Sequence, residues 1–151
     1  MNKQSKRARE ALDERLSELR PVSRYATPQK GWIRAIRDAL GMTRVQLAKR
    51  MDITPQSLLG IEESEAQGSV RLDTLRKAAE ALDCTLVHVL VPNKPLAEQV
   101  DNRARQVALR AIGGVAHSMA IEDQAARADL EERIADFIST SLRDRDLWDD
   151  P

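Results

Sequence analysis

The stretch from Met51 to Ser64 reads MDITPQSLLGIEES, and its polar residues lie where a helix would begin. Thr54 suits a helix N-cap, and Pro55 suits the first turn, where a missing N–H costs nothing. Gln56 and Ser57 then place an amide and a hydroxyl on that turn. Because such groups donate and accept hydrogen bonds, the chemistry predicted here is recognition of polar groups on another molecule.

Gly60 lies in the middle of the same predicted helix, where glycine costs roughly 1 kcal/mol relative to alanine. Leu59 beside it is expected to project outward. One interpretation is that the missing side chain lets the helix backbone approach another molecule closely. The alternative is that Gly60 is merely tolerated.

Residues typical of catalysis or metal binding are not arranged for either. His88 and His117 have no Cys or carboxylate cluster at metal-ligand spacing, so no metal site is predicted. Cys84 lacks a basic neighbour and is interpreted as a small packed residue. The sequence also has no glycine-rich phosphate loop. We therefore expect a protein that is not an enzyme and needs no cofactor.

The composition favours a helical, intracellular protein. The chain has 151 residues, of which 42% are hydrophobic, 32% charged and only 3% aromatic, so aliphatic packing must dominate. A single cysteine allows no internal disulfide. The first residues lack the apolar core of a signal peptide, and no stretch approaches the roughly 20 apolar residues that span a bilayer. A cytoplasmic protein without a membrane segment is expected.

The net charge is zero, but the charges are unevenly distributed. Residues 1–53 contain 13 Lys/Arg and 6 Asp/Glu, a balance of +7. Residues 54–101 contain 4 and 8, and residues 102–151 contain 7 and 10, so both are acidic. A basic front half is typical of nucleic-acid binders, although solvated helix faces that differ in sign would give the same count.

The central part of the chain predicts four short helices. Apolar spacing and caps place them at residues 31–40, 43–51, from Thr54 up to a loop at 65–70, and 72–83. Gly41 suits a positive φ at the end of the first, and Thr43 with Gln46 forms a capping box for the second.

The flanking segments are expected to add further elements. Residues 4–20 predict a helix with the stripe Ala8, Leu12, Leu16 and Leu19, and residues 21–30 a linker. Residues 84–92, CTLVHVLVP, predict a strand that would pair with its copy in a second subunit, with a short fifth helix as the competing interpretation. Residues 95–118 predict a long helix, a last helix begins near Asp123, and DRDLWDDP is a polar tail with an exposed Trp148.

Two short capped helices joined by a tight turn make a helix-turn-helix. Residues 31–83, above all GMTRVQLAKRMDITPQSLLGIEE, resemble the phage-repressor-like, XRE-type DNA-binding domain. One departure is Asp52, where many members have glycine; aspartate tolerates a left-handed φ better than most residues. The expected fold is mainly α, a five-helix-type helix-turn-helix domain with a terminal strand and additional N- and C-terminal helices.

Over its whole length the chain resembles the family called mobile mystery protein A. The motifs that carry this resemblance are LDERL, GWIRAIRDALGM, TPQSLLGIEESEA, LVHVLVP, VAHSMAIEDQ and LWDD. That family is typically encoded beside a Fic-domain protein, so the resemblance implies a DNA-binding regulator or an antitoxin-like partner of such a protein. The inhibitory signature of some Fic partners is absent from the sequence.

A helix-turn-helix of this type would place the helix that begins at Thr54 in the major groove of double-stranded DNA. Gln56 could then bond adenine, Ser57 a base or a phosphate, and Leu59 a thymine methyl group, while Gly60 allows close approach. These four residues are the predicted base-reading set.

Phosphate contacts are expected around this helix. Thr43 and Arg44 begin the preceding helix, whose N–H groups suit an anion. The resemblance implies further contacts, from Thr54, Gln67, Ser69, Arg71 and Thr74. For Arg44 and Arg71 the alternative is a solvated surface charge. The resemblance also implies a structural ion pair between Arg37 and Glu62 that orients the reading helix.

The expected organisation has three parts. Residues 1–29 form an N-terminal helix and linker, residues 30–92 the helix-turn-helix domain with its strand, and residues 93–151 a helical dimerisation or partner region. The function expected is an autorepressor or antitoxin-like regulator that binds an inverted-repeat operator as a homodimer. The alternative is a helical adaptor that binds and neutralises a protein partner through its C-terminal half.

Overall fold

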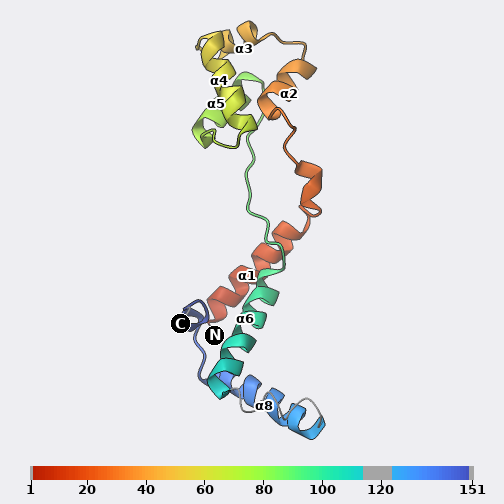
Figure 1. Cartoon of the computed structure of the whole chain (residues 1–151), viewed down its shortest axis with the longest axis vertical. Helices are drawn as coiled ribbons and strands as arrows, with labels where there is room; N and C mark the ends of the chain where they lie inside the picture. Colours follow the sequence, from red (N-terminus) through yellow and green to blue (C-terminus); the bar gives the residue numbers. More distant parts are fainter. Residues whose placement is uncertain (1, 114–123, 150–151) are drawn as a thin grey trace. The chain divides into compact units, whose positions relative to one another are not determined.

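Helices joined by turns and irregular segments make up residues 2–113 and 124–149, the part of the chain that the computed structural model describes (Figure 1). These residues form two compact units. The central unit comprises residues 21–90, and the terminal unit comprises residues 1–20 together with 91–151. The first twenty residues therefore fold with the C-terminal region, whereas the sequence had placed them in a part of their own.

The central unit contains a short 3-10 helix and four α-helices. They are η1 (Val22–Tyr25), α2 (Trp32–Ala39), α3 (Arg44–Arg50), α4 (Pro55–Ala66) and α5 (Leu72–Ala81). Left-handed residues allow the tight turns between them. Gly41 has φ 65° after α2, and Asp52 has φ 55° between α3 and α4, as its tolerance of this region predicts.

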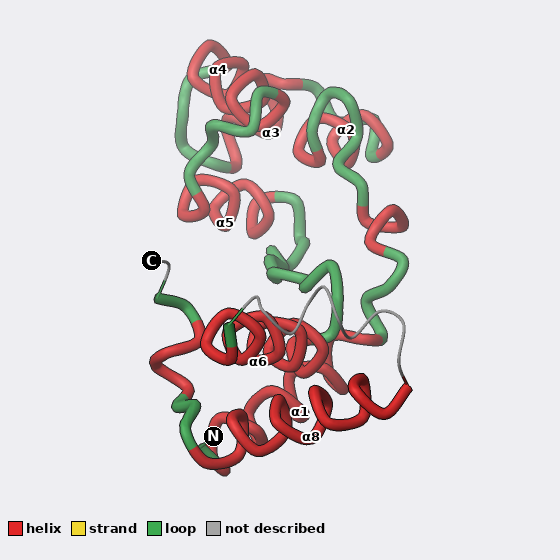
Figure 2. The backbone as a smooth tube through the Cα atoms, turned by 60° about the horizontal axis from the view of Figure 1, so that its bottom comes forward, coloured by secondary structure: helices red, strands yellow, loops and turns green. Residues whose placement is uncertain are grey.

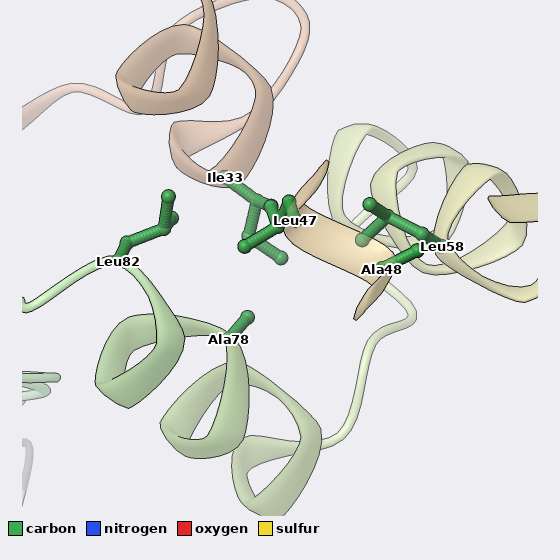
Figure 3. Packing of buried hydrophobic residues seen from close by; sticks show 6 residues of the cluster. All are labelled: Ile33, Leu47, Ala48, Leu58, Ala78 and Leu82. Atoms are coloured by element: carbon green, nitrogen blue, oxygen red, sulfur yellow. The ribbon is translucent and has the colours of Figure 1, made fainter. Parts of the chain in front are cut away.

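An aliphatic core holds the central unit together. Figure 3 shows its buried members, which come from all four α-helices: Ile33, Leu47, Ala48, Leu58, Ala78 and Leu82. Leu47 and Leu58 have no exposed surface. Burying a leucine side chain stabilises a fold by roughly 1.5–3 kcal/mol, so these two side chains contribute strongly to packing α3 and α4 into one cluster.

The terminal unit is built on α1 (Lys3–Ser17), α6 (Leu96–Ile112) and α8 (Gln124–Thr140), followed by the 3-10 helix η2 (Asp144–Leu147). Its main core cluster is formed by the buried residues Val100, Ala104, Leu142 and Leu147. The predicted stripe of α1 is only partly used, because Ala8 and Leu12 are exposed while Leu16 and Leu19 are half-buried.

The predicted strand at residues 84–92 is wrong. Figure 2 draws this stretch as loop, and no strand occurs anywhere in the described residues. Its apolar side chains are largely exposed, with Val87 at 76% and Leu90 at 92%. The physical reason is that a strand needs a neighbouring strand to satisfy its backbone, and β-prone side chains do not supply one.

Two predicted boundaries and the predicted C-terminal tail also need correction. The helix expected over 95–118 ends at Ile112, where Gly113 takes φ 88°; residues 114–118 lie outside the described part, as do the first residues of the last predicted helix. The loop expected at 65–70 begins later, because Glu65 and Ala66 belong to α4. The polar tail contains η2, whose Leu147 is buried, although Trp148 is exposed as expected.

No helix within the described ranges has both the length and the apolar character needed to cross a membrane.

Candidate nucleic-acid interface

The start of α4 is organised by the hydroxyl of Thr54. Thr54 Oγ1 accepts a hydrogen bond from the backbone N–H of Ser57 at 3.1 Å, and the two hydroxyl oxygens lie 2.8 Å apart. Pro55 occupies the first turn, as predicted. Both hydroxyls are therefore engaged in the cap, although they remain exposed and each retains further hydrogen-bonding capacity.

The outward side of α4 is sparsely covered. Gln56 and Gly60 are exposed one helical turn apart, and Leu59 is half-buried. A Cβ added at Gly60 would meet nothing within 4 Å. No hydrogen bond of the Gln56 side chain occurs with the described residues, so its amide is available to a ligand. The helix thus presents an amide beside an uncovered stretch of backbone.

Two of the three carboxylates on α4 are turned away from the outward side of the helix. Glu62 is 3% exposed and Glu65 is 8% exposed, and both are engaged by groups of α2. Glu63 is exposed, three residues after Gly60 on the same stripe, and sequence reasoning did not single it out. The reading side therefore carries one exposed carboxylate, at a distance from the helix start where Gln56 lies.

The buried Glu65 caps α2. Its carboxylate accepts hydrogen bonds from the backbone N–H groups of Trp32 at 2.8 Å and Ile33 at 3.0 Å. These donors lack partners within their own helix, and a negative charge complements the positive end of the helix dipole. Gly31 precedes them with φ 83°, and a Cβ there would lie 2.6 Å from Glu65 Oε2. The local sequence gave no signal for this contact, because its partners are more than thirty residues apart.

Glu62 forms the ion pair that the resemblance implied. Its Oε1 lies 2.7 Å from Arg37 Nε, and both side chains are buried. The hydrogen bond to Glu62 raises the pKa of the Arg37 guanidinium above its ordinary value. Arg37 also donates to the carbonyl of Met42 at 3.0 Å and lies 2.8 Å from Asp38. The pair thus connects α2 to the middle of α4 and to the turn before α3.

The predicted phosphate-binding residues at the start of α3 are held in place. Thr43 caps the helix in a complete capping box with Gln46, as predicted. Arg44 Nε lies 3.5 Å from Glu62 Oε2, and about a third of the Arg44 side chain is exposed. Arg44 is therefore neither free in solvent nor fully buried.

The predicted phosphate-binding residues after α4 are all close to the surface. Gln67 is the C-cap of α4, and the hydroxyl of Ser69 donates to the carbonyl of Ser64 at 3.3 Å. Arg71 is paired with Asp73 through two hydrogen bonds of 3.2 and 3.1 Å, and Asp73 also accepts from the backbone N–H of Thr74 at 2.8 Å. Asp73, which the sequence analysis overlooked, offsets the charge of Arg71.

The central unit has a smaller excess of basic residues than the first 53 residues of the sequence. Residues 21–90 hold 10 Lys/Arg and 8 Asp/Glu, a balance of only +2, because six of the basic residues counted in the front half belong to residues 1–20 of the terminal unit. Two of the eight acidic side chains, Glu62 and Glu65, are buried, and so is one of the ten basic side chains, Arg37, which leaves nine basic and six acidic side chains that are not buried. The exposed surface of the central unit is therefore more basic than its composition.

No group of three His, Cys, Asp or Glu side chains in the described part of the chain is close enough to hold a metal ion.

Comparison with known families gives a match that lies within the central unit. Residues 33–89 match the helix-turn-helix family. The match includes α3, the turn at Asp52 and α4, which are the two helices and the turn of the motif. Neither the curated proteins nor the solved structures give a match to the chain. The family match thus supports the helix-turn-helix within the central unit.

Proposed function

We propose, starting from the helix-turn-helix at residues 33–89, that this protein is a DNA-binding transcriptional regulator. In this proposal α4 lies in the major groove of double-stranded DNA, with its first turn at the base edges. The observation that carries it is the outward side of α4, where Gln56 is exposed beside an uncovered Gly60 while Glu62 and Glu65 are turned inward.

Base reading is assigned to Gln56, Ser57, Leu59 and Gly60. A glutamine amide can bond adenine through two hydrogen bonds, and the open space at Gly60 suits close approach of a base pair. Leu59 is half-buried, which leaves part of its side chain for a thymine methyl group. Phosphate contacts are assigned to residues on either side of the reading helix: Thr43, Arg44, Thr54, Gln67, Ser69, Arg71 and Thr74.

The regulator is proposed to act as a homodimer on an inverted repeat. One reading helix contacts only a few base pairs, so two copies on half-sites about one helical turn apart would supply the specificity that one lacks. Residues 93–151 are the proposed dimerisation region, since the matched DNA-binding motif lies outside them.

The finer assignment follows the resemblance to mobile mystery protein A. The motifs GWIRAIRDALGM and TPQSLLGIEESEA support it, and both lie in or beside the helix-turn-helix. On this basis we propose an autorepressor, or an antitoxin-like partner of a Fic-domain protein encoded nearby. A change in the transcription of a neighbouring Fic gene when this protein is deleted would support the assignment.

A second candidate function is that of an adaptor that binds a protein partner through residues 93–151. The observation that favours it is the sparse packing of α8, in which Ile134 is the buried residue, together with the exposed Trp148. Removing residues 95–151 separates the two functions. Loss of both dimerisation and DNA binding supports the dimerisation role, whereas loss of partner binding alone supports the adaptor.

Footprinting tests the main proposal. The purified full-length protein is incubated with the DNA upstream of its own gene, and salt is titrated. We expect protection of an inverted repeat, with an affinity that falls as salt rises because phosphate contacts release counterions. A scrambled DNA of the same length and composition is the control. Equal affinity for both DNAs at every salt concentration would overturn sequence-specific binding.

A further inference from the structure

Five charged side chains of the central unit form a continuous network in which the signs alternate. Arg34 Nε lies 3.6 Å from Asp38, and Asp38 lies 2.8 Å from Arg37 Nη1. Arg37 Nε lies 2.7 Å from Glu62, and Glu62 lies 3.5 Å from Arg44 Nε. The network joins α2, α3 and α4, and its three cations exceed its two anions by one charge.

Glu62 is shared between two arginines from different helices. Its Oε2 lies 3.4 Å from Arg37 Nη2 and 3.5 Å from Arg44 Nε, while Oε1 is taken by Arg37 Nε. Arg37 alone already donates a hydrogen bond to each oxygen of the buried Glu62 carboxylate. The second arginine is therefore an addition that the burial of Glu62 does not require.

Arg44 is oriented by this carboxylate. Its Nε is buried and makes no hydrogen bond, yet it faces Glu62, and the side chain as a whole remains about one third exposed. A guanidinium has five N–H donors in a rigid plane, of which only one is on Nε. No hydrogen bond of the other four occurs with the described residues. The Arg44 guanidinium is thus paired with Glu62 on its Nε side, and its Nη donors are left for an anion.

We propose that Glu62 is a positioning residue that holds the Arg44 guanidinium ready for a DNA phosphate. This inference rests on the proposed function. Without the ion pair to Glu62, which we call the tether, the flexible Arg44 side chain would lose rotamer freedom when it binds the phosphate. With the tether, that entropy has already been lost on folding. Because Glu62 belongs to the reading helix, the same carboxylate fixes the phosphate contact relative to the base-reading side chains.

A double-mutant cycle on the full-length protein tests the proposal. Affinity for the footprinted DNA is measured against salt for the wild type, Arg44→Ala, Glu62→Gln and the double variant. We expect each single change to weaken binding roughly tenfold and to lower the salt slope by about one. The double variant should bind no worse than either single variant. Losses that multiply would overturn the proposal, since Glu62 would then act independently of Arg44.

Arg34→Ala is the matched control. Arg34 is another end of the same network and has nearly the same exposure, 37% against 35%, but it contacts Asp38 and not Glu62. Its effect, whatever its size, should multiply with that of Glu62→Gln. If Glu62→Gln is coupled to Arg34→Ala in DNA affinity as strongly as to Arg44→Ala, the effect is a general loss of structure and not a specific tether.

A second measurement covers the case in which Glu62→Gln does not fold. In the wild-type protein, NMR follows exchange of the Arg44 Nε–H with solvent, with the exposed Arg71 as reference. We expect slow exchange for Arg44, unchanged on adding DNA, while the Arg44 Nη groups respond to DNA. Exchange as fast as that of Arg71 overturns the tether. If the wild-type protein does not bind DNA, both this inference and the proposed function are overturned. If it binds DNA but the losses caused by Arg44→Ala and Glu62→Gln multiply in the double variant, only this inference is overturned.

Discussion

The carboxylate of Asp13 accepts a hydrogen bond of 2.7 Å from the backbone N–H of Leu96, and its other oxygen accepts one of 3.0 Å from Ala97. These groups are 83 and 84 positions apart in the chain, and they join α1 to the start of α6. Asp13 acts as a cap for a helix to which it does not belong, because an anion satisfies the orphan N–H groups there. This contact holds α1 against α6 within the terminal unit.

Replacing Asp13 by Asn should lower the melting temperature at neutral pH and have no effect in strong acid. The hydrogen bonds from Ala97 and Leu96 lower the pKa of Asp13 below its ordinary value. The stability that they provide is therefore present above the ordinary pKa of about 4 and is lost as the pH falls through the lowered pKa. Thermal unfolding of both proteins across this pH range measures the difference. Glu14→Gln, which removes an exposed carboxylate from the same helix, is the control.

Replacing Gly31 by Ala should destabilise the central unit by more than about 1–2 kcal/mol. The positive φ of 83° alone accounts for roughly that amount, and the new methyl group would collide with the carboxylate that caps α2. Gly68→Ala is a matched control, since Gly68 has φ 74° but open space around it. Urea unfolding of both variants isolates the collision. Equal losses would show that Glu65 moves aside without cost.

Replacing Gly60 by Ala should make the free protein more stable and its complex with DNA weaker. Alanine is favoured over glycine within a helix by roughly 0.5–1 kcal/mol, and the site has room for a methyl group. If the glycine serves close approach to a base pair, the same methyl group hinders binding. Thermal unfolding and DNA affinity are measured on the same preparation. Greater stability with unchanged affinity would favour the interpretation that Gly60 is merely tolerated.

Replacing Gln56 by Ala should relax base choice at one position of the operator. The side chain is exposed and bonds to none of the described residues, so stability should not change. Loss of a two-bond contact to adenine costs roughly 1–3 kcal/mol with the preferred base and little with the others. The measurement is the affinity of the wild type and of Gln56→Ala for operators that carry each of the four bases at each position in turn. A loss of the same size on every variant would remove Gln56 from the base-reading set.

Features that depend on neighbours in the sequence were predicted well. The capping box of Thr43 and Gln46, the cap at Thr54, the proline in the first turn and the left-handed Asp52 all appear in the structure. Each arises from groups within four residues of one another, where the chain itself holds the partners together. The helix-turn-helix could be predicted from the sequence for this reason.

Apart from the ion pair between Arg37 and Glu62, which the resemblance implied, features that need a distant partner could not be predicted in the same way. The segment 84–92 has the side chains of a strand but no neighbouring strand, and so it remains irregular. Glu65, expected in a loop, is buried as the cap of α2, and Asp73 offsets an arginine assigned to phosphate binding. A pattern of side chains shows what a segment could do, but it does not show whether a partner is present.

The sequence by itself determined the helices, their caps and the turn that places α3 against α4, because local hydrogen bonds and the period of apolar residues specify them. Only the tertiary structure decided which charges face solvent. It buried Glu62 and Glu65 against α2 and joined Arg44 to Glu62, and it placed the basic N-terminal helix in the other unit. Charge acts through space, so its effect at the reading helix depends on contacts between residues that are far apart in the chain.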